Sequence, residues 1–141
     1  MISSHIPSVP HPVNEPVRQY LPGSAETLAL QAEWDRMAAI KYEIPCVING
    51  KEVFTDKTEN VVMPHNHQHI LGVSYLAGDK ELNDAVDSAL AAQEQWRSMP
   101  WQSRVAVFLK AADLLAGPYR NTINAATMLG QSKNCFQAEI D

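Results

Sequence analysis

Residues 44–54 read IPCVINGKEVF, and this stretch decides how the first half of the chain folds. β-Branched and aromatic residues stand on either side of Asn49-Gly50, a pair that tolerates the positive φ angles of a two-residue hairpin turn. We therefore predict a β-hairpin with strands near residues 46–48 and 51–54. Two more strand-like runs follow, NVVM at residues 60–63 and HILGVSYLA at residues 69–77.

The stretch PHNHQH at residues 64–69 separates these two runs and carries three of the five histidines. His65, His67 and His69 occupy alternate positions, which share one face on an extended strand and raise the question of a metal site. The proline and asparagine favour a turn, so we expect the histidines on the connection between the strands. Zinc also needs a fourth ligand, and no cysteine or acidic cluster with ligand spacing accompanies the run. An ordinary polar turn is favoured over a histidine metal site.

Helical patterns lie on both sides of the strands. Ser24 can cap a helix that continues to about Ala39. After the strands, Asp79 can cap a helix whose apolar residues recur at three- and four-residue steps. This stripe consists of Leu82, Ala85, Val86, Ala89, Leu90 and Trp96. Because one face is apolar, the helix needs a surface to pack against.

Three further patterns complete the helical half of the chain. A helix after Pro100 should end at Gly117-Pro118, with the glycine in a left-handed conformation. Its apolar face consists of Val105, Phe108, Leu109, Ala112 and Leu115. The next helix is expected before Gly130, and Ser132 can cap a last one that begins KNCFQAEID. The last helix has no capping glycine and carries acidic residues near its end, so we expect the chain to be truncated within a helix.

The overall composition limits the classes of protein that the chain can represent. Its 141 residues suffice for one modest core, and we expect an α/β unit at residues 23–141 behind a proline-rich arm at residues 1–22. The net charge of −5, without a basic cluster, argues against nucleic acid as a partner. No apolar run approaches the ~20 residues that cross a bilayer. The lack of a basic residue before Arg18 argues against a signal or transit peptide.

Cys135 is the side chain that most invites a catalytic interpretation, because it follows a glycine turn near a predicted helix start. No histidine or carboxylate is identifiable as its base, so a packed apolar role is favoured. Arg97, Arg104 and Arg120 could bind an anion, but on polar helix faces solvated or ion-paired roles are favoured. The two cysteines of the chain have no paired spacing and fit a reducing compartment.

The remaining candidate residues predict no chemistry either. The glycines lack the spacing of a G-x-G-x-x-G motif or a P-loop, so no phosphate cradle is expected. The tryptophans, Trp34, Trp96 and Trp101, are expected to pack in a core or an interface. The residues alone therefore predict an α/β domain with no catalytic, cofactor-binding or metal-ligating residue among them.

From Asn14 onward, six segments together resemble the N-terminal region of one enzyme family, the mitochondrial Δ1-pyrroline-5-carboxylate dehydrogenases of the aldehyde dehydrogenase superfamily. The segments are NEPV at 14–17, IPCVINGKEV at 44–53, P-x-N-H-x-H at 64–69, LNDAVDSALAAQEQW at 82–96, FLKAADLLAGPYR at 108–120 and QAEID at 137–141. The resemblance covers about nine tenths of the chain. Where this family usually has an aromatic residue, the present sequence has His65.

The resemblance implies the N-terminal portion of the cofactor-binding domain of an aldehyde dehydrogenase fold. It implies an NAD-dependent enzyme, a homo-oligomer of the mitochondrial matrix, that oxidises the small aldehyde L-glutamate γ-semialdehyde to L-glutamate in proline breakdown. It also implies that the catalytic cysteine and the cofactor loops lie downstream of Asp141, and that Cys135 is not the nucleophile. Residues 1–141 alone are therefore expected to be inactive.

Two other interpretations remain open: a short non-catalytic interaction module derived from the same family, and a histidine-turn metal binder. A dehydrogenase fragment should expose the apolar stripes of residues 82–96 and 105–115, because their packing partners are missing. A self-sufficient module should bury both stripes and unfold cooperatively.

Overall fold

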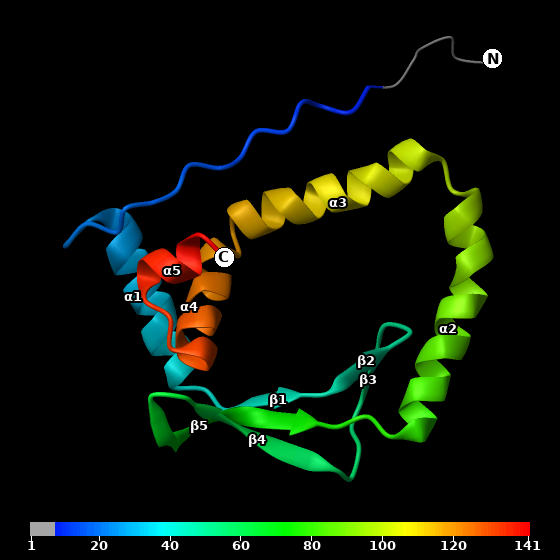
Figure 1. Cartoon of the computed structure of the whole chain (residues 1–141), viewed down its shortest axis with the longest axis horizontal. Helices are drawn as coiled ribbons and strands as arrows, with labels where there is room; N and C mark the ends of the chain where they lie inside the picture. The colour runs from blue at the N-terminus through cyan, green and yellow to red at the C-terminus, as the bar shows by residue number, and fades with distance from the viewer. Residues whose placement is uncertain (1–7) are drawn as a thin grey trace.

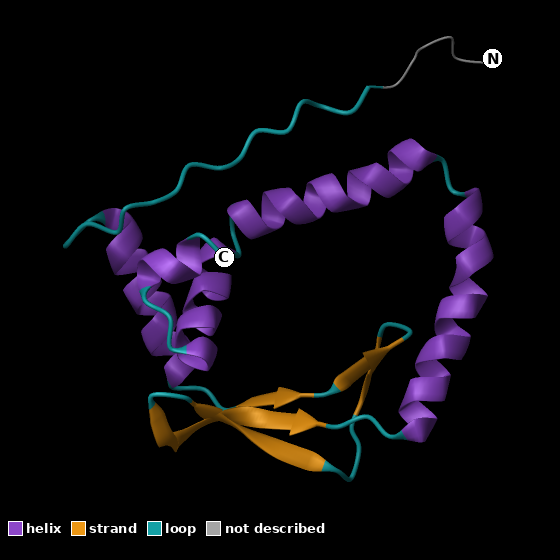
Figure 2. Cartoon of the chain, viewed as in Figure 1, coloured by secondary structure: helices purple, strands orange, loops and turns teal. Residues whose placement is uncertain are grey.

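The computed structural model describes residues 8–141 as an α/β chain whose strands are followed by helices (Figures 1 and 2). In chain order the elements are α1 (Ala25–Ala38), β1 (Tyr42–Ile44), β2 (Cys46–Ile48), β3 (Lys51–Val53), β4 (Thr58–Met63), β5 (Asn66–Tyr75), α2 (Asp79–Ser98), α3 (Trp101–Ala116), α4 (Arg120–Gln131) and α5 (Cys135–Glu139). The predicted fold class is confirmed. Of the predicted proline-rich arm, residues 8–20 form an extended segment, and residues 1–7 lie outside the described part of the chain.

The predicted hairpin is confirmed. Strands β2 and β3 pair in antiparallel fashion, with Val47 opposite Glu52. Asn49 and Gly50 have φ angles of 52° and 71°, the left-handed values that a two-residue turn between right-twisted strands requires. The turn residues therefore set the register of this hairpin.

A three-stranded sheet has the order β1-β5-β4, with β1 parallel and β4 antiparallel to β5. Strand β1 is only three residues long and was not predicted from the sequence. Gly72 of β5 lies directly beside it, and a Cβ atom at this position would stand 2.6 Å from the carbonyl oxygen of Tyr42. The close approach of β1 and β5 thus depends on a glycine at position 72.

The expectation that all three histidines lie on a connection is wrong for two of them. Only Pro64 and His65 form the turn, and β5 already begins at Asn66, so that His67 and His69 lie on the strand. A two-residue connection is enough to reverse the chain, and pairing resumes with Asn66 opposite Met63. The register then shifts around Val62, so alternation does not place the histidines as in a regular ladder.

The packed part of the molecule is the place where α1, α4 and the sheet meet (Figure 1). One buried cluster consists of Tyr20, Leu30 and Ala125, and a second consists of Met63, Leu71 and Leu129. Helix α4 contributes to both, because Ala125 and Leu129 are four positions apart and lie on the same side of the helix. Helix α1 begins as predicted, with the Ser24 hydroxyl accepting the N–H of Thr27 at 3.3 Å.

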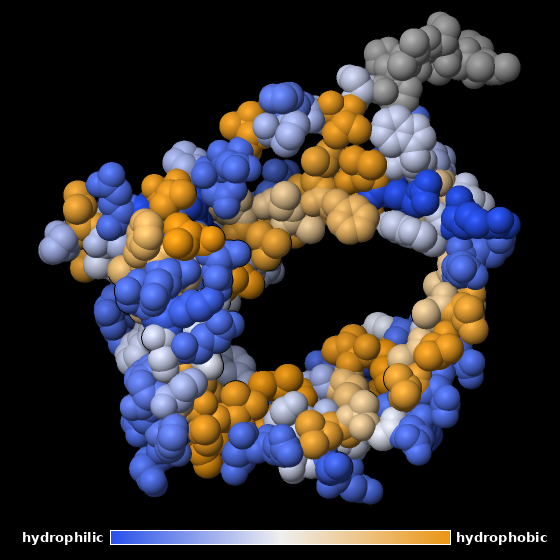
Figure 3. Space-filling view, in the orientation of Figure 1, coloured by the Kyte–Doolittle hydropathy of each residue, from blue (hydrophilic) through white to orange (hydrophobic). Residues whose placement is uncertain are grey.

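Helices α2 and α3 pack very differently, since no residue of either helix is buried. Leu82 and Leu90 of α2 are each 62% exposed, and Phe108 of α3 is 67% exposed. Together with the sheet and the α1–α4–α5 group, the two helices surround an opening whose rim carries many apolar side chains (Figure 3). The exposure of both stripes is the result expected of a dehydrogenase fragment.

Two predicted helix ends need correction. Gly78, rather than Asp79, precedes the first turn of α2, and its N–H donates to the Glu81 carboxylate at 2.9 Å. Gly117 ends α3 with a φ of −108°, so it is not left-handed. The glycine is favoured there for another reason: a Cβ atom would stand 2.8 Å from the carbonyl oxygen of Asp113.

The start of α5 also differs from the prediction. Helix α4 continues through Gly130 to Gln131, and Ser132 ends it with a left-handed φ of 58°. Ser132 therefore cannot cap α5. Asn134 does so instead: its side chain accepts the N–H of Gln137 at 2.9 Å, while the Gln137 side chain accepts the N–H of Asn134 at 3.0 Å.

Candidate functional site

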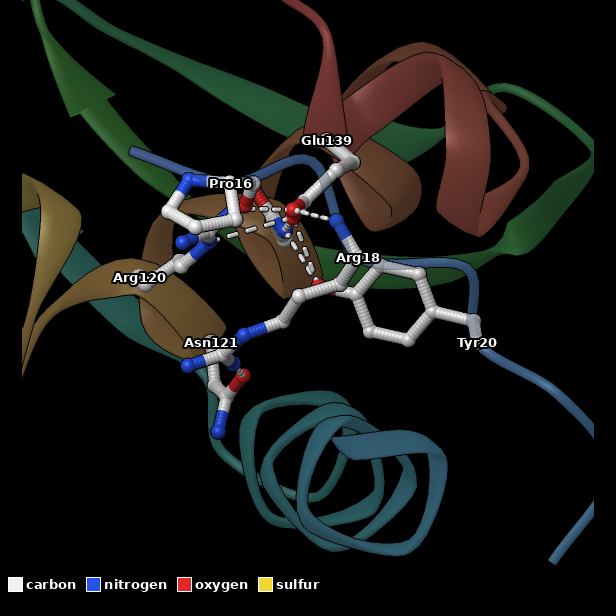
Figure 4. Close-up of polar contacts among 7 residues, drawn as sticks. Pro16, Arg18, Tyr20, Arg120, Asn121 and Glu139 are labelled. Atoms are coloured by element: carbon white, nitrogen blue, oxygen red, sulfur yellow. Dashed lines mark hydrogen bonds and ion pairs between the residues drawn. The ribbon is translucent and has the colours of Figure 1, made fainter. Parts of the chain in front are cut away.

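The most densely bonded polar group in the described residues is the carboxylate of Glu139, at the end of α5 (Figure 4). It accepts the hydroxyl of Tyr20 at 2.7 Å, the amide group of Asn124 at 2.8 Å and the backbone N–H of Arg18 at 2.8 Å. The guanidinium of Arg120 donates to both carboxylate oxygens. We call these five residues the Glu139 cluster.

The Glu139 cluster joins three parts of the chain that are far apart in sequence. Arg18 and Tyr20 belong to the N-terminal segment, Arg120 and Asn124 to α4, and Glu139 to α5. Arg18 and Glu139 are 121 positions apart. The cluster thus holds the N-terminal segment against the two C-terminal helices.

Burial and hydrogen bonding act in opposite directions on the pKa values of Glu139 and Arg120. Burial raises the pKa of the Glu139 carboxyl, but the hydrogen bonds from Arg120, the Arg18 amide, Tyr20 and Asn124 outweigh it and hold the pKa at about 2. The same carboxylate raises the pKa of Arg120 through their hydrogen bond. Burial, followed by the bond to Glu139, raises the pKa of Tyr20. Glu139 is ionised at neutral pH, and its oxygens are occupied by protein donors, so it is suited to holding structure together and not to proton transfer.

Sequence reasoning considered Arg120 but missed the rest of the Glu139 cluster. The predicted ion-paired role of Arg120 is confirmed, whereas its predicted place on a polar face is wrong, because only 9% of the residue is exposed. The sequence offered one signal: Arg120 and Asn124 stand four positions apart and therefore lie on the same side of α4. Nothing local identifies Glu139, because its partners come from distant segments.

The other predicted candidates lie apart from this cluster. Cys135 is half-buried against the Tyr20–Leu30–Ala125 core, which confirms its packed role. Arg97 pairs with Glu94 at 2.8 Å on the exposed side of α2, as expected for an ion-paired surface arginine. Arg104, on α3, is half-buried, and among residues 8–141 its Nε atom has no hydrogen-bond partner.

The tryptophans divide into two kinds. Trp34 packs against both buried clusters, as predicted. Trp96 and Trp101 are 41% and 43% exposed, so they do not fill a core within the described residues. Both lie near the junction of α2 and α3, on the part of the molecule that lacks buried residues.

Residues 8–141 bring together no group of three or more His, Cys, Asp or Glu side chains suited to a metal ion. The Nδ1 atom of His65 lies 2.8 Å from the Ser132 hydroxyl, which ties the turn between β4 and β5 to the end of α4. The three sequence-neighbouring histidines are thus not assembled around one point. In the same range of residues, no helix is long and apolar enough to span a membrane.

A hollow of about 460 Å³ opens between the sheet and α4. Its walls are mainly apolar and come from all five strands together with α1 and α4, with Ile44, Val47, Leu71 and Leu129 among them. Two carboxylates, Glu43 and Glu52, stand at its lining. Such a surface suits the burial of apolar side chains better than the binding of a charged metabolite.

The chain is similar in sequence to part of several known enzymes. The chain is 46% identical to the Δ1-pyrroline-5-carboxylate dehydrogenase of Agaricus bisporus over 134 residues, which are 94% of this chain and 24% of that protein. It is 43% identical to the human mitochondrial Δ1-pyrroline-5-carboxylate dehydrogenase over 128 residues, covering 91% of this chain and 23% of that protein. The chain thus spans about a quarter of the length of these relatives.

A solved structure of an enzyme with a similar name also matches this chain over about a quarter of its own length. The Δ1-pyrroline-5-carboxylate dehydrogenase of Mycobacterium tuberculosis, bound with NAD, superimposes with a TM-score of 0.95 at 45% identity, over 98% of this chain and 26% of that one. The model of the aldehyde dehydrogenase family matches residues 53–141, which is more than half of the chain. On this match, the chain belongs to the aldehyde dehydrogenase family.

Proposed function

We propose that this chain is the N-terminal part of an NAD-dependent dehydrogenase that oxidises L-glutamate γ-semialdehyde, formed from Δ1-pyrroline-5-carboxylate, to L-glutamate. The observation that carries the proposal is the 46% identity to the Agaricus bisporus enzyme over nearly the whole of this chain. The NAD-bound structure from Mycobacterium tuberculosis supports the choice of cofactor. We propose further that the complete enzyme is a homo-oligomer and acts in proline breakdown.

The described residues do not themselves fit NAD. The hollow beside the sheet is mainly apolar and offers no group of donors for a pyrophosphate, and the donors of the Glu139 cluster are already bonded to Glu139. A dinucleotide needs backbone N–H groups free to receive its phosphates. We therefore assign cofactor binding and catalysis to the other three quarters of the enzyme. We assign no cofactor-binding or catalytic residue to this chain.

The location of the complete enzyme is proposed to be the mitochondrial matrix. The human and Dictyostelium discoideum relatives are named as mitochondrial proteins, and the chain is 39% identical to the latter over 134 residues. Fluorescence microscopy of the full-length protein tests this proposal, since a cytosolic signal would contradict it.

A non-catalytic interaction module is the competing function. It should be self-sufficient, but α2 and α3 expose their apolar stripes. Faces of this size are uncommon on proteins that act alone, so a dehydrogenase part is favoured.

A chimera tests the proposed function directly. The matched 134 residues of the Agaricus bisporus enzyme are replaced by the corresponding residues of this chain, and NADH formation from Δ1-pyrroline-5-carboxylate is followed. We expect activity close to that of the parent enzyme, and none from residues 1–141 alone. A chimera that folds and binds NAD but leaves this substrate unoxidised would contradict the proposal.

A further inference from the structure

The N-terminal segment of residues 8–20, here called the strap, contains no helix or strand of its own. It nevertheless follows a defined path from the start of α1 toward α3 (Figure 1). Its residues are mostly exposed, with Val13 at 86% and Val17 at 56%. Tyr20 is its one buried apolar residue, so the rest of the segment needs other contacts to hold it in place.

Those contacts come from alternate residues at one end of the strap. The Pro16 carbonyl accepts a hydrogen bond from Arg120 at 2.7 Å, the Arg18 N–H donates to Glu139 at 2.8 Å, and the Tyr20 hydroxyl donates to Glu139 at 2.7 Å. In an extended chain, every second residue faces the same side. One face of the strap thus lies on the Arg120–Glu139 pair, as the close-up shows (Figure 4).

The backbone at the anchored end is strained. Tyr20 has a φ of 50°, a left-handed value that costs a residue with a large side chain free energy. Such a conformation persists only where its surroundings fix it. Here Tyr20 is fixed by its buried ring and by its hydroxyl, which also accepts the amide N–H of Asn124 at 3.0 Å.

The other end of the strap meets α3. Ser8, Val9 and Pro10 line a small hollow of about 120 Å³ together with residues from the first half of α3, among them Trp101 and Val105. No residue of α3 is buried, so each neighbour matters for holding this helix. The strap therefore connects α3 to the packed part of the molecule along a route separate from the chain between α3 and α4.

We propose that the strap is a conformational brace for α3, locked in place by the buried Arg120–Glu139 pair. Loss of the lock frees the strap from α4 and α5 and loosens the N-terminal half of α3. The other elements of the packed part keep contacts of their own, between Leu30 and Ala125 and within the cluster of Met63, Leu71 and Leu129. The brace is a property of the fold and is independent of the reaction that the complete enzyme catalyses.

Limited proteolysis with trypsin tests the lock, because Arg18 is a cleavage site whose backbone is bound to Glu139. In E139Q we expect cleavage after Arg18 to accelerate by about tenfold or more, the effect of losing a charge-assisted hydrogen bond. Cleavage after Arg97, an exposed site on α2, is the internal reference. D141N is the matched control, since its carboxylate pairs with Lys133 outside the Glu139 cluster, and it should leave the ratio of the two rates unchanged.

Amide hydrogen exchange in the same samples tests the brace. Exchange in residues 101–109 should rise in E139Q and stay as in the wild type in D141N. Equal acceleration at Arg18 and Arg97 would indicate general unfolding and overturn the proposal, as would an unchanged ratio in folded E139Q. If E139Q does not fold, Tyr20→Phe takes its place, because it removes one hydroxyl and keeps the Arg120–Glu139 ion pair. Tyr20→Phe should accelerate cleavage after Arg18 but not after Arg97. An unchanged ratio of these two cleavage rates would overturn the proposal.

Discussion

At the scale of single residues, the strongest interactions are those that local sequence patterns do not reveal. The Glu139 carboxylate and the Arg120 guanidinium are both buried, and each would be costly to bury alone. Glu139 is surrounded by donors, so its low pKa and its structural role have the same cause. Two residue-scale predictions follow from the charges and from the close approach of the strands.

The first concerns acid stability. Glu139 has a pKa of about 2 in the folded chain against an ordinary value of 4.5. Its ionised carboxylate therefore contributes to the free energy of unfolding in full above pH 4.5, and this contribution is lost as the pH falls through 2. This contribution is of the order of 3 kcal/mol. Urea unfolding at several pH values should show E139Q less stable than the wild type at pH 7, with the difference narrowing below pH 4.5. A constant difference across this range would contradict the assignment, and Glu33, whose pKa is also about 2, titrates equally in both proteins.

The second concerns Gly72. In Gly72→Ala the added methyl group would lie 2.6 Å from the Tyr42 carbonyl oxygen, so β1 must move away from β5. We expect a loss of about 1–3 kcal/mol in the free energy of unfolding. Gly130→Ala, at a helical position with open space, is the control and should not destabilise the chain. Equal stabilities for G72A and the wild type would show that β1 does not pair as described.

At the scale of elements, the sequence predicts well wherever one short stretch decides the outcome. The hairpin follows from Asn49 and Gly50, and the start of α1 from Ser24. Strand β1 was missed because three residues carry no periodicity and the strand exists only through its pairing with β5. The Glu139 cluster was missed for the same reason, since its partners meet only in the folded chain.

Helix α2 offers an element-scale prediction. Leu82 is 62% exposed, so Leu82→Ala should change the free energy of unfolding of the isolated chain by less than about 0.5 kcal/mol. In the active chimera, where the remaining enzyme covers this face, the same change should cost about 2–5 kcal/mol. Asp87→Asn, off the apolar stripe, should be neutral in both proteins. Calorimetry of the four variants checks this, and an equally small effect of Leu82→Ala in the chimera would contradict it.

At the scale of the whole molecule, two parts of the chain differ in how well they are packed. The group of α1, α4, α5 and the sheet contains the buried clusters, whereas α2 and α3 contribute no buried residue and border an opening with an apolar rim (Figure 3). Periodicity revealed the apolar stripes of these helices, but only the structure shows that nothing in residues 8–141 covers them. We propose that the rest of the complete protein covers them.

Amide hydrogen exchange of α2 and α3, measured in the isolated chain and in the chimera, tests this claim most directly. We predict exchange in α2 (Asp79–Ser98) and in residues 110–116 of α3, beyond the strap, to be fast in the isolated chain and strongly slowed in the chimera, because burial against the remaining enzyme stabilises both helices. Exchange in α4 should change much less, since α4 is already packed. Equally slow exchange of α2 and α3 in both proteins would contradict the claim and favour a self-sufficient module.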